Sequence, residues 1–333
     1  MRTLLFIRSA CAVAALAAGI TAARAEEIEV GNYGVSANGM PYAVAMEKGF
    51  FKEEGADITG ILSSQGGGTS MRNMMTGSLA YGEINPTAVV IAIRQGADLR
   101  IISDNVLTVS EFIWASKMGS PVKTLQDLRG KKIGYTNPKS TSQALAILVA
   151  QAGGLKPDEA EYVKTGGFGE GVVALDLGSV DVAPIPEPLW SKYQGKYHPI
   201  AKASEILPAL DNVVGVTTGK AAETRGDFLR AILRARRKAV EFMYAHPDDA
   251  GVIIAKAYNL EPEVAKAAVR DLTSARSKDG LPYWGVGEFH VEGMNRMIDA
   301  QKLVGAISGD VDWSKVIDAR FLPDDLKAKS KIN

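Results

Sequence analysis

Residues 28–62, IEVGNYGVSANGMPYAVAMEKGFFKEEGADITGIL, form one strand–loop–helix–strand unit by their pattern. Residues 28–33 are a short strand-like run, and a loop of small residues follows them. Pro41 suits the first turn of a helix that continues to Gly55, where a glycine suits the helix end. Residues 57–62 are the next strand. Strands that alternate with helices in this way pair in parallel, so the stretch predicts an α/β protein with a parallel sheet.

The same pattern continues along the chain. Residues 79–84 and 100–105 are further strand-like runs, and a second series of strands and helices extends from Pro121 to about Ala209. After Thr218 the pattern is mainly helical. No repeat of fixed period and no low-complexity tract interrupts it.

Two strand-like runs suggest that the chain crosses between two lobes. EFIWAS, residues 111–116, looks like a strand that leaves the first lobe, and VVGVTT, residues 213–218, could run back beside it. Two strands between lobes would form a hinge, and hinge closure around a ligand is a known mechanism. A single continuous doubly wound sheet fits the periodicity equally well.

The first 25 residues have the features of a cleaved export signal. Two arginines precede an apolar run at 10–20, and Ala23-Arg24-Ala25 is a small-x-small cleavage site before Glu26. The run is too short for a transmembrane anchor, which needs about 20 apolar residues. The residues before Cys11 do not form a lipid-attachment motif. We therefore expect a mature chain that begins at Glu26 and is soluble in the periplasm.

The composition limits the classes of function. The chain of 333 residues is 46% hydrophobic and 23% charged, which is typical of a globular protein of about two domains. It has 38 basic and 38 acidic residues, so it lacks the excess positive charge that nucleic acid binding requires. Cys11, the only cysteine, lies in the predicted signal. The mature protein therefore has no thiolate for catalysis or metal binding.

The loops after the predicted strands are unusually small and polar. Ligands of open α/β sheets bind at the carboxyl ends of the strands, where several of these loops begin helices. A helix N-terminus offers unpaired N–H donors and partial positive charge to an anion. Serine and threonine at these places also act as simple N-caps, but so many such loops at one edge exceed what capping requires. The loops are 34–39, 63–70, 85–87, 137–142, 166–171 and 184–188.

The tract PIPEPLW, residues 184–190, contains a candidate ligand-binding carboxylate. Three prolines constrain the backbone around Glu187, and Trp190 follows one turn later. Glu187 could bind an amino or N–H group of a ligand, or it could be a solvated carboxylate at a helix start. Trp190 is one of several aromatic residues that could stack on a ligand or belong to the core.

No catalytic, metal-binding or cofactor-binding set is evident. The three histidines are far apart in sequence and lack the spacing of metal ligands. Residues 169–174, GEGVVA, match G-x-G-x-x-A, but no acidic residue follows at the distance that dinucleotide binding requires. Neither a nucleophile elbow nor a P-loop motif occurs. We therefore predict no catalytic residue, no metal and no cofactor.

Several blocks resemble one family of transport proteins. MPYAVAMEKGFFKEEGADI at 40–58 and TLQDLRGKKIGYTNPKSTSQALAILVAQAGGLKPDEAEYV at 124–163 are similar to periplasmic substrate-binding proteins of ABC importers, in the nitrate/sulfonate/taurine/pyrimidine-precursor family. SSQGGGTSMRNMMTGSLAYG at 63–82 and VALDLGSVDVAPIPEPLW at 173–190 continue the similarity in the family's order. IRQGADLRIIS at 93–103 and AVEFMYAHPDDA at 239–250 belong to the same series, so the similar blocks are spread over most of the mature chain.

The resemblance implies a type II periplasmic-binding-protein fold, with two α/β lobes, hinge strands and a ligand cleft between them. Lobe 1 would comprise residues 26–115 and 210–333, and lobe 2 would be the insertion 116–209. Ligand contacts would fall on Ser36, Asn38, Gly68, Thr69, Asn85, Thr87, Ser140, Thr141, Ser142 and Glu187. Ala80 stands where family members often have Asp. The acidic tract around Glu187 favours a ligand with both an acceptor and a donor end, such as an amino-sulfonate or a pyrimidine, over nitrate.

The predicted function is that of a monomeric, non-enzymatic receptor. It would capture a small polar or anionic solute by lobe closure and deliver it to an ABC permease and its ATPase at the inner membrane. Two alternatives remain open. The same cleft could serve a periplasmic sensor partner, or an enzyme of the same fold acting in pyrimidine-type biosynthesis.

Overall fold

The computed structural model describes residues 26–330 and residue 332. The predicted signal and its cleavage site lie outside the described residues. Among the described helices, none is long and apolar enough to cross a membrane.

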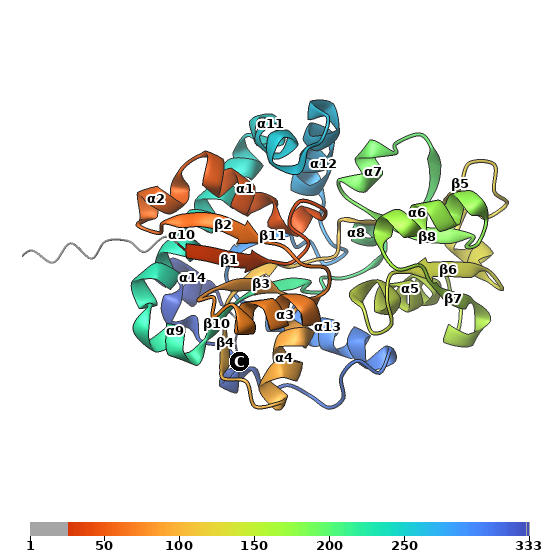
Figure 1. The fold of residues 1–333 in the computed structure, drawn as a ribbon. Helices are drawn as coiled ribbons and strands as arrows, with labels where there is room; N and C mark the ends of the chain where they lie inside the picture. The colour runs from red at the N-terminus through yellow and green to blue at the C-terminus, as the bar shows by residue number, and fades with distance from the viewer. Residues whose placement is uncertain (1–25, 331, 333) are drawn as a thin grey trace, which may run out of the picture.

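The strands form two separate sheets, at the left and the right of Figure 1. The first sheet has the order β11-β4-β10-β3-β1-β2. Its strands are β1 (Glu26–Val30), β2 (Ile58–Leu62), β3 (Gly82–Ile84), β4 (Leu99–Val106), β10 (Val213–Thr218) and β11 (Trp284–Gly287). The second sheet has the order β7-β6-β8-β5-β9. Its strands are β5 (Phe112–Lys117), β6 (Lys132–Tyr135), β7 (Glu161–Lys164), β8 (Val182–Pro186) and β9 (Tyr197–Lys202).

Both sheets are mixed, so the predicted parallel pairing is correct only in part. β1 pairs in parallel with β2 and β3, and β6 does so with β7 and β8. The other pairs are antiparallel. The expectation that residues 213–218 pair with the strand near 111–116 is wrong, because β10 pairs with β3 and β4 while β5 pairs with β8 and β9. The crossing segments are therefore residues 107–111 and 207–212, just outside these strands.

The helices pack on both sheets. In the first part of the chain they are α1 (Met40–Glu47), α2 (Phe50–Glu54), α3 (Gly67–Thr76) and α4 (Pro86–Arg94). The helix expected from Pro41 to Gly55 is divided between α1 and α2, because Gly49 takes a left-handed conformation with φ 73°. The second sheet carries α5 (Thr141–Ala152), α6 (Phe168–Leu177), α7 (Leu189–Lys192) and α8 (Ala203–Ile206).

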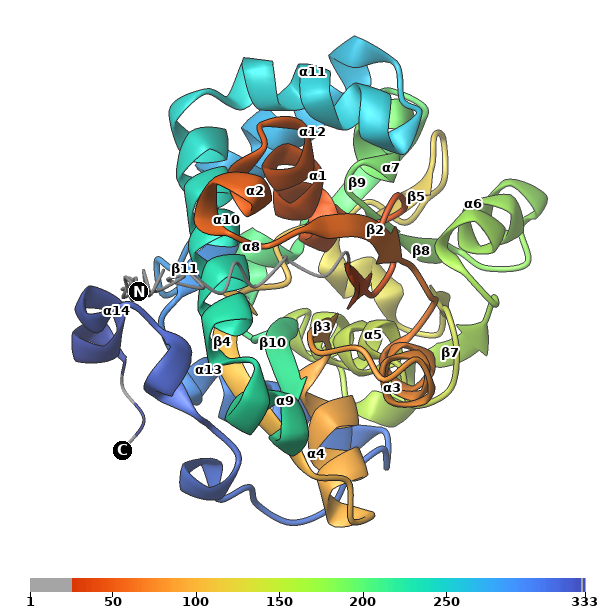
Figure 2. The ribbon, with the colours of Figure 1, turned by 60° about the vertical axis from the view of Figure 1, so that its left-hand side comes forward.

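The C-terminal helices return to the first sheet. They are α9 (Gly219–Thr224), α10 (Gly226–Ala245), α11 (Pro247–Tyr258), α12 (Pro262–Ser274), α13 (Val291–Leu303) and α14 (Asp324–Lys329). Figure 2 shows α11 across the top of this unit, next to α1 and α10. Buried residues recur every three or four positions along α10 and form one face of the helix. They include Leu229, Ile232, Leu233, Arg236, Ala239 and Val240. An arginine therefore occupies a core position of an otherwise apolar face.

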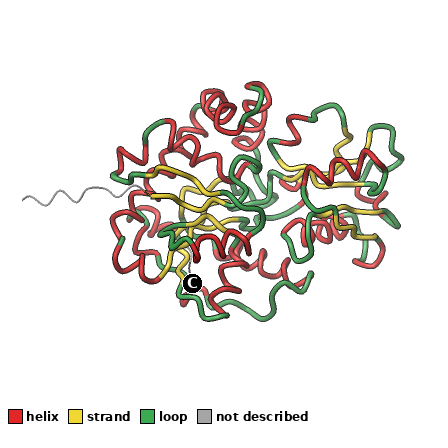
Figure 3. Tube along the Cα trace, in the orientation of Figure 1, coloured by secondary structure: helices red, strands yellow, loops and turns green. Residues whose placement is uncertain are grey.

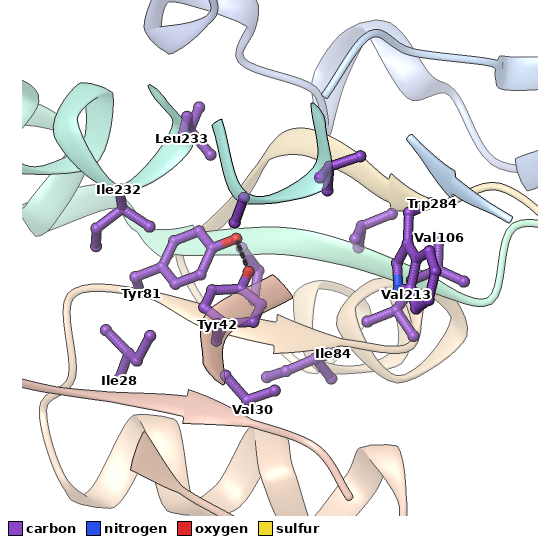
Figure 4. Packing of buried hydrophobic residues seen from close by; sticks show 14 of the residues in the cluster. Ile28, Val30, Tyr42, Tyr81, Ile84, Val106, Val213, Ile232, Leu233 and Trp284 are labelled. Atoms are coloured by element: carbon purple, nitrogen blue, oxygen red, sulfur yellow. Dashed lines mark hydrogen bonds between the residues drawn. The ribbon is translucent and has the colours of Figure 1, made fainter. Parts of the chain in front are cut away.

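The core consists of one large cluster at the first sheet and two smaller clusters on the second. In the large cluster, Ile28 and Val30 of β1 pack with Ile84 of β3 and with residues of α10 (Figure 4). Tyr42 and Tyr81 lie within it, with their hydroxyls 2.7 Å apart. A hydrogen-bonded pair of hydroxyls is thus embedded in the apolar core, and Tyr81 immediately precedes β3.

Candidate functional site

A cavity of about 1160 Å³ lies between the two sheets. Its walls include residues at the carboxyl ends of five strands. They are Gly31, Asn85 and Thr136, each the first residue after a strand, Gly166, the second residue after β7, and Pro186, the last residue of β8. Figure 3 shows loops gathered between the two sets of strands. The cavity is therefore at the carboxyl ends of strands from both sheets, where α/β proteins bind their ligands.

Most of the residues predicted for the site are brought together in this cavity. They come from loops up to about a hundred positions apart in the sequence, on both sheets. Those that line the cavity are Ser36, Asn38, Gly68, Thr69, Asn85, Thr87, Ser140, Thr141 and Ser142.

Four helices begin at the wall of the cavity. The starts of α3, α4, α5 and α6 all contribute lining residues, two from each side of the cavity. Each start concentrates unpaired N–H groups and partial positive charge, which favours an anionic or hydrogen-bond-accepting group. The cavity can thus hold such a group with few cationic side chains.

The four helix starts differ in their capping. The Asn85 side chain accepts a hydrogen bond from Thr87 N and caps α4, and the Ser140 side chain accepts one from Gln143 N and caps α5. The N-cap interpretation is therefore correct for these two side chains. Gly66, with φ 84°, precedes α3, whose N-terminus has no side-chain cap. The N-terminus of α6, after Gly167, also has no side-chain cap. The first N–H groups of α3 and α6 are thus more available to a ligand than those of the capped helices α4 and α5.

Asn85 joins the two sides of the cavity. Its Nδ2 donates to Thr141 Oγ1 of α5 at 3.3 Å and to Asn212 O in the second crossing segment at 3.0 Å. On the opposite wall, Ser142 Oγ lies 2.8 Å from Thr136 Oγ1 and 3.0 Å from Ser140 Oγ. These hydroxyls form a connected network that can donate to a bound group.

The structure places Glu187 and Trp190 elsewhere. Neither lines the large cavity; Glu187 borders a separate one of about 250 Å³ with Lys202 and Asp271. The Glu187 carboxylate is buried and accepts hydrogen bonds from Ser191 N at 3.2 Å and Ser191 Oγ at 3.0 Å. Burial raises the pKa of Glu187 to about 7.

The prediction of a solvated carboxylate is therefore wrong for Glu187, whereas a contact of Glu187 with a ligand stays a prediction. The side chain is not solvated, and it folds back toward the start of α7 instead of entering the cavity between the sheets. Trp190 is buried in the apolar cluster that contains Ile113 and Ile185, so it belongs to the core of the second unit. The sequence showed the rigid proline-rich tract, but the direction of these side chains depends on tertiary packing.

Two buried acidic residues that the sequence analysis did not single out line the cavity. Glu111, in the first crossing segment, is fully buried and its Oε1 accepts a hydrogen bond from Asn212 Nδ2 at 2.7 Å. Burial raises its pKa to about 8. Glu83 of β3 also borders the cavity, and its Oε2 accepts from Tyr42, Asn105 and Arg236. Glu83 and Glu111 could have been found in the sequence, because each is an acidic residue in an apolar strand-like run.

No metal centre is evident in the described part of the chain. Within residues 26–330, no group of three or more histidine, cysteine, aspartate or glutamate side chains is arranged to hold a metal ion. The cavity offers a ligand hydrogen-bonding side chains, helix N-termini and buried carboxylates.

Comparisons with known proteins agree with this geometry. A family model described as NMT1/THI5 like matches residues 36–250. A search of curated protein sequences finds no match. The periplasmic aliphatic sulphonate binding protein SsuA from Escherichia coli has a similar structure, with a TM-score of 0.72 and 17% identity, covering 88% of this chain and 91% of that one.

Two further structures have the same fold. The periplasmic nitrate-binding protein NrtA from Synechocystis PCC 6803 has a TM-score of 0.70 and 14% identity, covering 92% of this chain and 87% of that one. The desulfurization enzyme DSZB has a TM-score of 0.62 and 13% identity, covering 91% of this chain and 99% of that one. The expected periplasmic-binding-protein fold is thus confirmed, and it occurs in both binding proteins and an enzyme.

Proposed function

The chain belongs to the NMT1/THI5-like family, and from that premise we propose that it is the solute-binding receptor of an ABC importer. It captures a small polar or anionic organic solute, sulfonate/taurine-like or pyrimidine-like, in the cavity between its lobes. It then presents the closed, loaded form to a membrane permease and its ATPase. The site of action is the periplasm, which the chain reaches after cleavage of residues 1–25.

The arrangement of the helix N-termini is the observation that carries this proposal. The starts of α3 and α4 lie on one side of the cavity, and those of α5 and α6 on the other. A ligand that engages both sides is bound fully only when the lobes are closed. Because a ligand shifts an equilibrium by its differential affinity for the two states, this geometry couples binding to closure.

Ligand binding and closure can be measured together on residues 26–333. A thermal-shift screen would include taurine, alkanesulfonates, nitrate, pyrimidines and amino acids. A ligand present at about 100 times its Kd stabilises the folded state by roughly 2.7 kcal/mol, which raises Tm by several degrees. Small-angle X-ray scattering should then show a smaller radius of gyration with the same ligand. A tight ligand that leaves the radius unchanged would contradict the closure mechanism.

A pair of threonine variants tests whether the cavity is the binding site. Thr141→Val removes the hydroxyl that faces Asn85 across the cavity, and we expect it to weaken ligand binding. Thr59→Val changes an exposed threonine of β2 away from the cavity and should leave binding unchanged. Equal affinities in both variants would place the ligand elsewhere.

An enzymatic role is the second candidate, because DSZB shows that this fold supports catalysis. Incubation of the protein with each bound ligand, followed by mass spectrometry, separates the two functions. Recovery of unchanged ligand supports the receptor, whereas a product that accumulates with protein concentration supports an enzyme.

A further inference from the structure

Two buried carboxyl groups lie where the second crossing segment enters the first sheet. Asp104 belongs to β4, Asp211 belongs to the crossing segment 207–212, and both residues are completely buried. As ionised groups, Asp104 Oδ1 and both carboxyl oxygens of Asp211 have no hydrogen-bond donor among the described residues. Native proteins leave few buried polar atoms unsatisfied. A proton on one of the two carboxyls would let it donate to the other.

The surroundings of this pair stabilise one negative charge but not two. His290, the N-cap residue of α13, donates its backbone N–H to Asp104 Oδ2 at 3.1 Å, and its Nδ1 lies 3.8 Å from the same oxygen. The helix N-terminus and a protonated imidazole both favour one carboxylate. The other cation that acts on Asp211 is Arg296, and it is paired with Asp279 at 2.5 Å. A second charge in the pair would therefore lack a cation of its own.

The protonation of the cluster follows from these charges. Burial and the neighbouring Asp104 carboxyl raise the pKa of Asp211 well above its usual value. Burial lowers the pKa of His290, but the Asp104 and Glu288 carboxylates outweigh it, so that the pKa of His290 is raised overall. Two adjacent carboxyls that cannot both ionise hold one proton, which belongs to the pair and not to either residue.

The pair lies at a junction of three elements. Asp211 N donates to Gly293 O in the first turn of α13 at 3.2 Å, and Asn212 N donates to Val106 O at the end of β4 at 2.8 Å. A Cβ at Gly293 would collide with Asp211 Oδ1, so the carboxyl rests directly on this turn. Further along α13, Met297 belongs to an apolar cluster of the second sheet. The crossing segment is thus held against β4 and against a helix that contacts both units.

We propose that Asp104 and Asp211 form a proton-operated latch on the second crossing segment, with His290 as its charge partner. The latched segment holds the shared proton. Release of the segment exposes both carboxyls to water, where both ionise, so rising pH favours the released segment. Because lobe movement must bend the crossing segments, the latch links the hinge to pH. The inference goes beyond the proposed function, since it concerns the protein without ligand.

Two other acidic residues contact the same segment and must be separated from the latch. Glu111 Oε1 accepts a hydrogen bond from Asn212 Nδ2 at 2.7 Å, and burial raises the pKa of Glu111 to about 8. Asp279 Oδ1 accepts one from Ala209 N at 2.8 Å. Burial raises the pKa of Asp279, but its hydrogen bonds outweigh burial and lower the pKa to about 2. Glu111 can therefore titrate near neutral pH, whereas Asp279 stays ionised.

Hydrogen exchange of the segment 207–212 tests the latch in residues 26–333 without ligand. Mass spectrometry would follow this peptide from pH 5 to pH 9, with rates corrected for intrinsic exchange. Between the ordinary carboxyl pKa and the raised pKa of the pair, each opening releases one proton, so protection should fall by at least about tenfold per pH unit. Asp211→Asn keeps a neutral donor toward Asp104 and should reduce this dependence by about one factor of ten per pH unit. Glu111→Gln, the matched control, should keep the dependence that the latch causes.

Several results would overturn the inference. Protection that does not change with pH in the unmodified protein would do so without the need for any variant to fold. An unchanged dependence in folded Asp211→Asn, or its loss in Glu111→Gln, would assign the proton to another group. His290→Gln should keep the dependence, and its loss there but not in Asp211→Asn would assign the proton to the histidine.

A bound cation is the remaining alternative to the shared proton. Protection that follows added magnesium or its removal by a chelator, and not pH, would place a cation at the carboxyls and overturn the latch. Fully pH-dependent protection, unaffected by either reagent, supports it. These results leave the proposed function untouched, because the thermal-shift screen tests ligand binding separately.

Discussion

Arg236 should be essential for the stability of the first sheet, since it is a buried cation on the core face of α10. Its guanidinium donates to Glu83 Oε2 at 3.1 Å, Gly285 O at 2.8 Å and Asn105 O at 2.7 Å. Arg236→Met fills much of the same volume but leaves the buried Glu83 carboxylate without a cation. Breaking a buried ion pair by removing one partner costs about 3–5 kcal/mol, so Tm should fall on the order of 10 °C.

The pH dependence of this loss tests the electrostatic reason. In Arg236→Met, the Glu83 pKa should rise further, so the folded state binds a proton that the unfolded state releases. Stability then falls as pH rises, and the loss should be larger at pH 8 than at pH 5. Urea unfolding followed by tryptophan fluorescence measures both values. Adding Glu83→Gln should recover part of the loss, because it removes the unpaired charge.

A neighbouring residue supplies the control for this experiment. Arg237 is the next residue on α10, and its ion pairs with Glu241 at 2.8 Å and Asp325 at 3.0 Å lie at the surface. Arg237→Met should therefore cost less than about 1 kcal/mol. A similar small cost for Arg236→Met, or a loss independent of pH, would refute the assigned role of the buried pair.

Three further predictions concern the cavity and the tract near it. Asn85→Ala removes the cap of α4 and the donors that cross the cavity. The free energy of unfolding should therefore fall by about 1–2 kcal/mol, and calorimetry should show weaker ligand binding. A Cβ at Gly67 would lie 3.0 Å from Ala88 Cβ, whereas one at Gly68 would meet nothing within 4 Å. Gly67→Ala should therefore lower Tm and Gly68→Ala should not, and equal melting curves would contradict the packing of α3 on α4. The raised pKa of Glu187, about 7, means that its contribution to stability is present below about pH 4.5 and is lost as pH rises through 7. Glu187→Gln should remove this dependence, worth roughly 3 kcal/mol, from urea unfolding curves measured between pH 4 and 8.

The alternation of strands and helices was readable from the sequence because it depends on local spacing. Residues 28–33, 57–62 and 100–105 were predicted as strands, and β1, β2 and β4 cover most of them. The pairing of the strands could not be predicted from local spacing. β10 enters the first sheet antiparallel between β3 and β4, a position that depends on the path of the chain through the second sheet.

The loops that line the cavity could also be predicted from the sequence. Small polar residues after a strand and before a helix identify a carboxyl edge, and the edges of both sheets meet in this fold. Ser140 and Asn85 were therefore placed correctly at the cavity without knowledge of the tertiary structure. Whether either contacts a ligand remains a prediction, since both already cap helices.

The sequence by itself determined the α/β class, the polar character of the loops and the resemblance to periplasmic binding proteins. These features depend on residue order and on periodicities of a few residues. The tertiary structure alone decided the direction of the buried carboxylates. Glu187 turns away from the large cavity, while Glu111 borders it between the crossing segments. The two environments differ because burial and charge pairing depend on side chains that converge from distant parts of the chain, such as Tyr283 and Asn212 around Glu111.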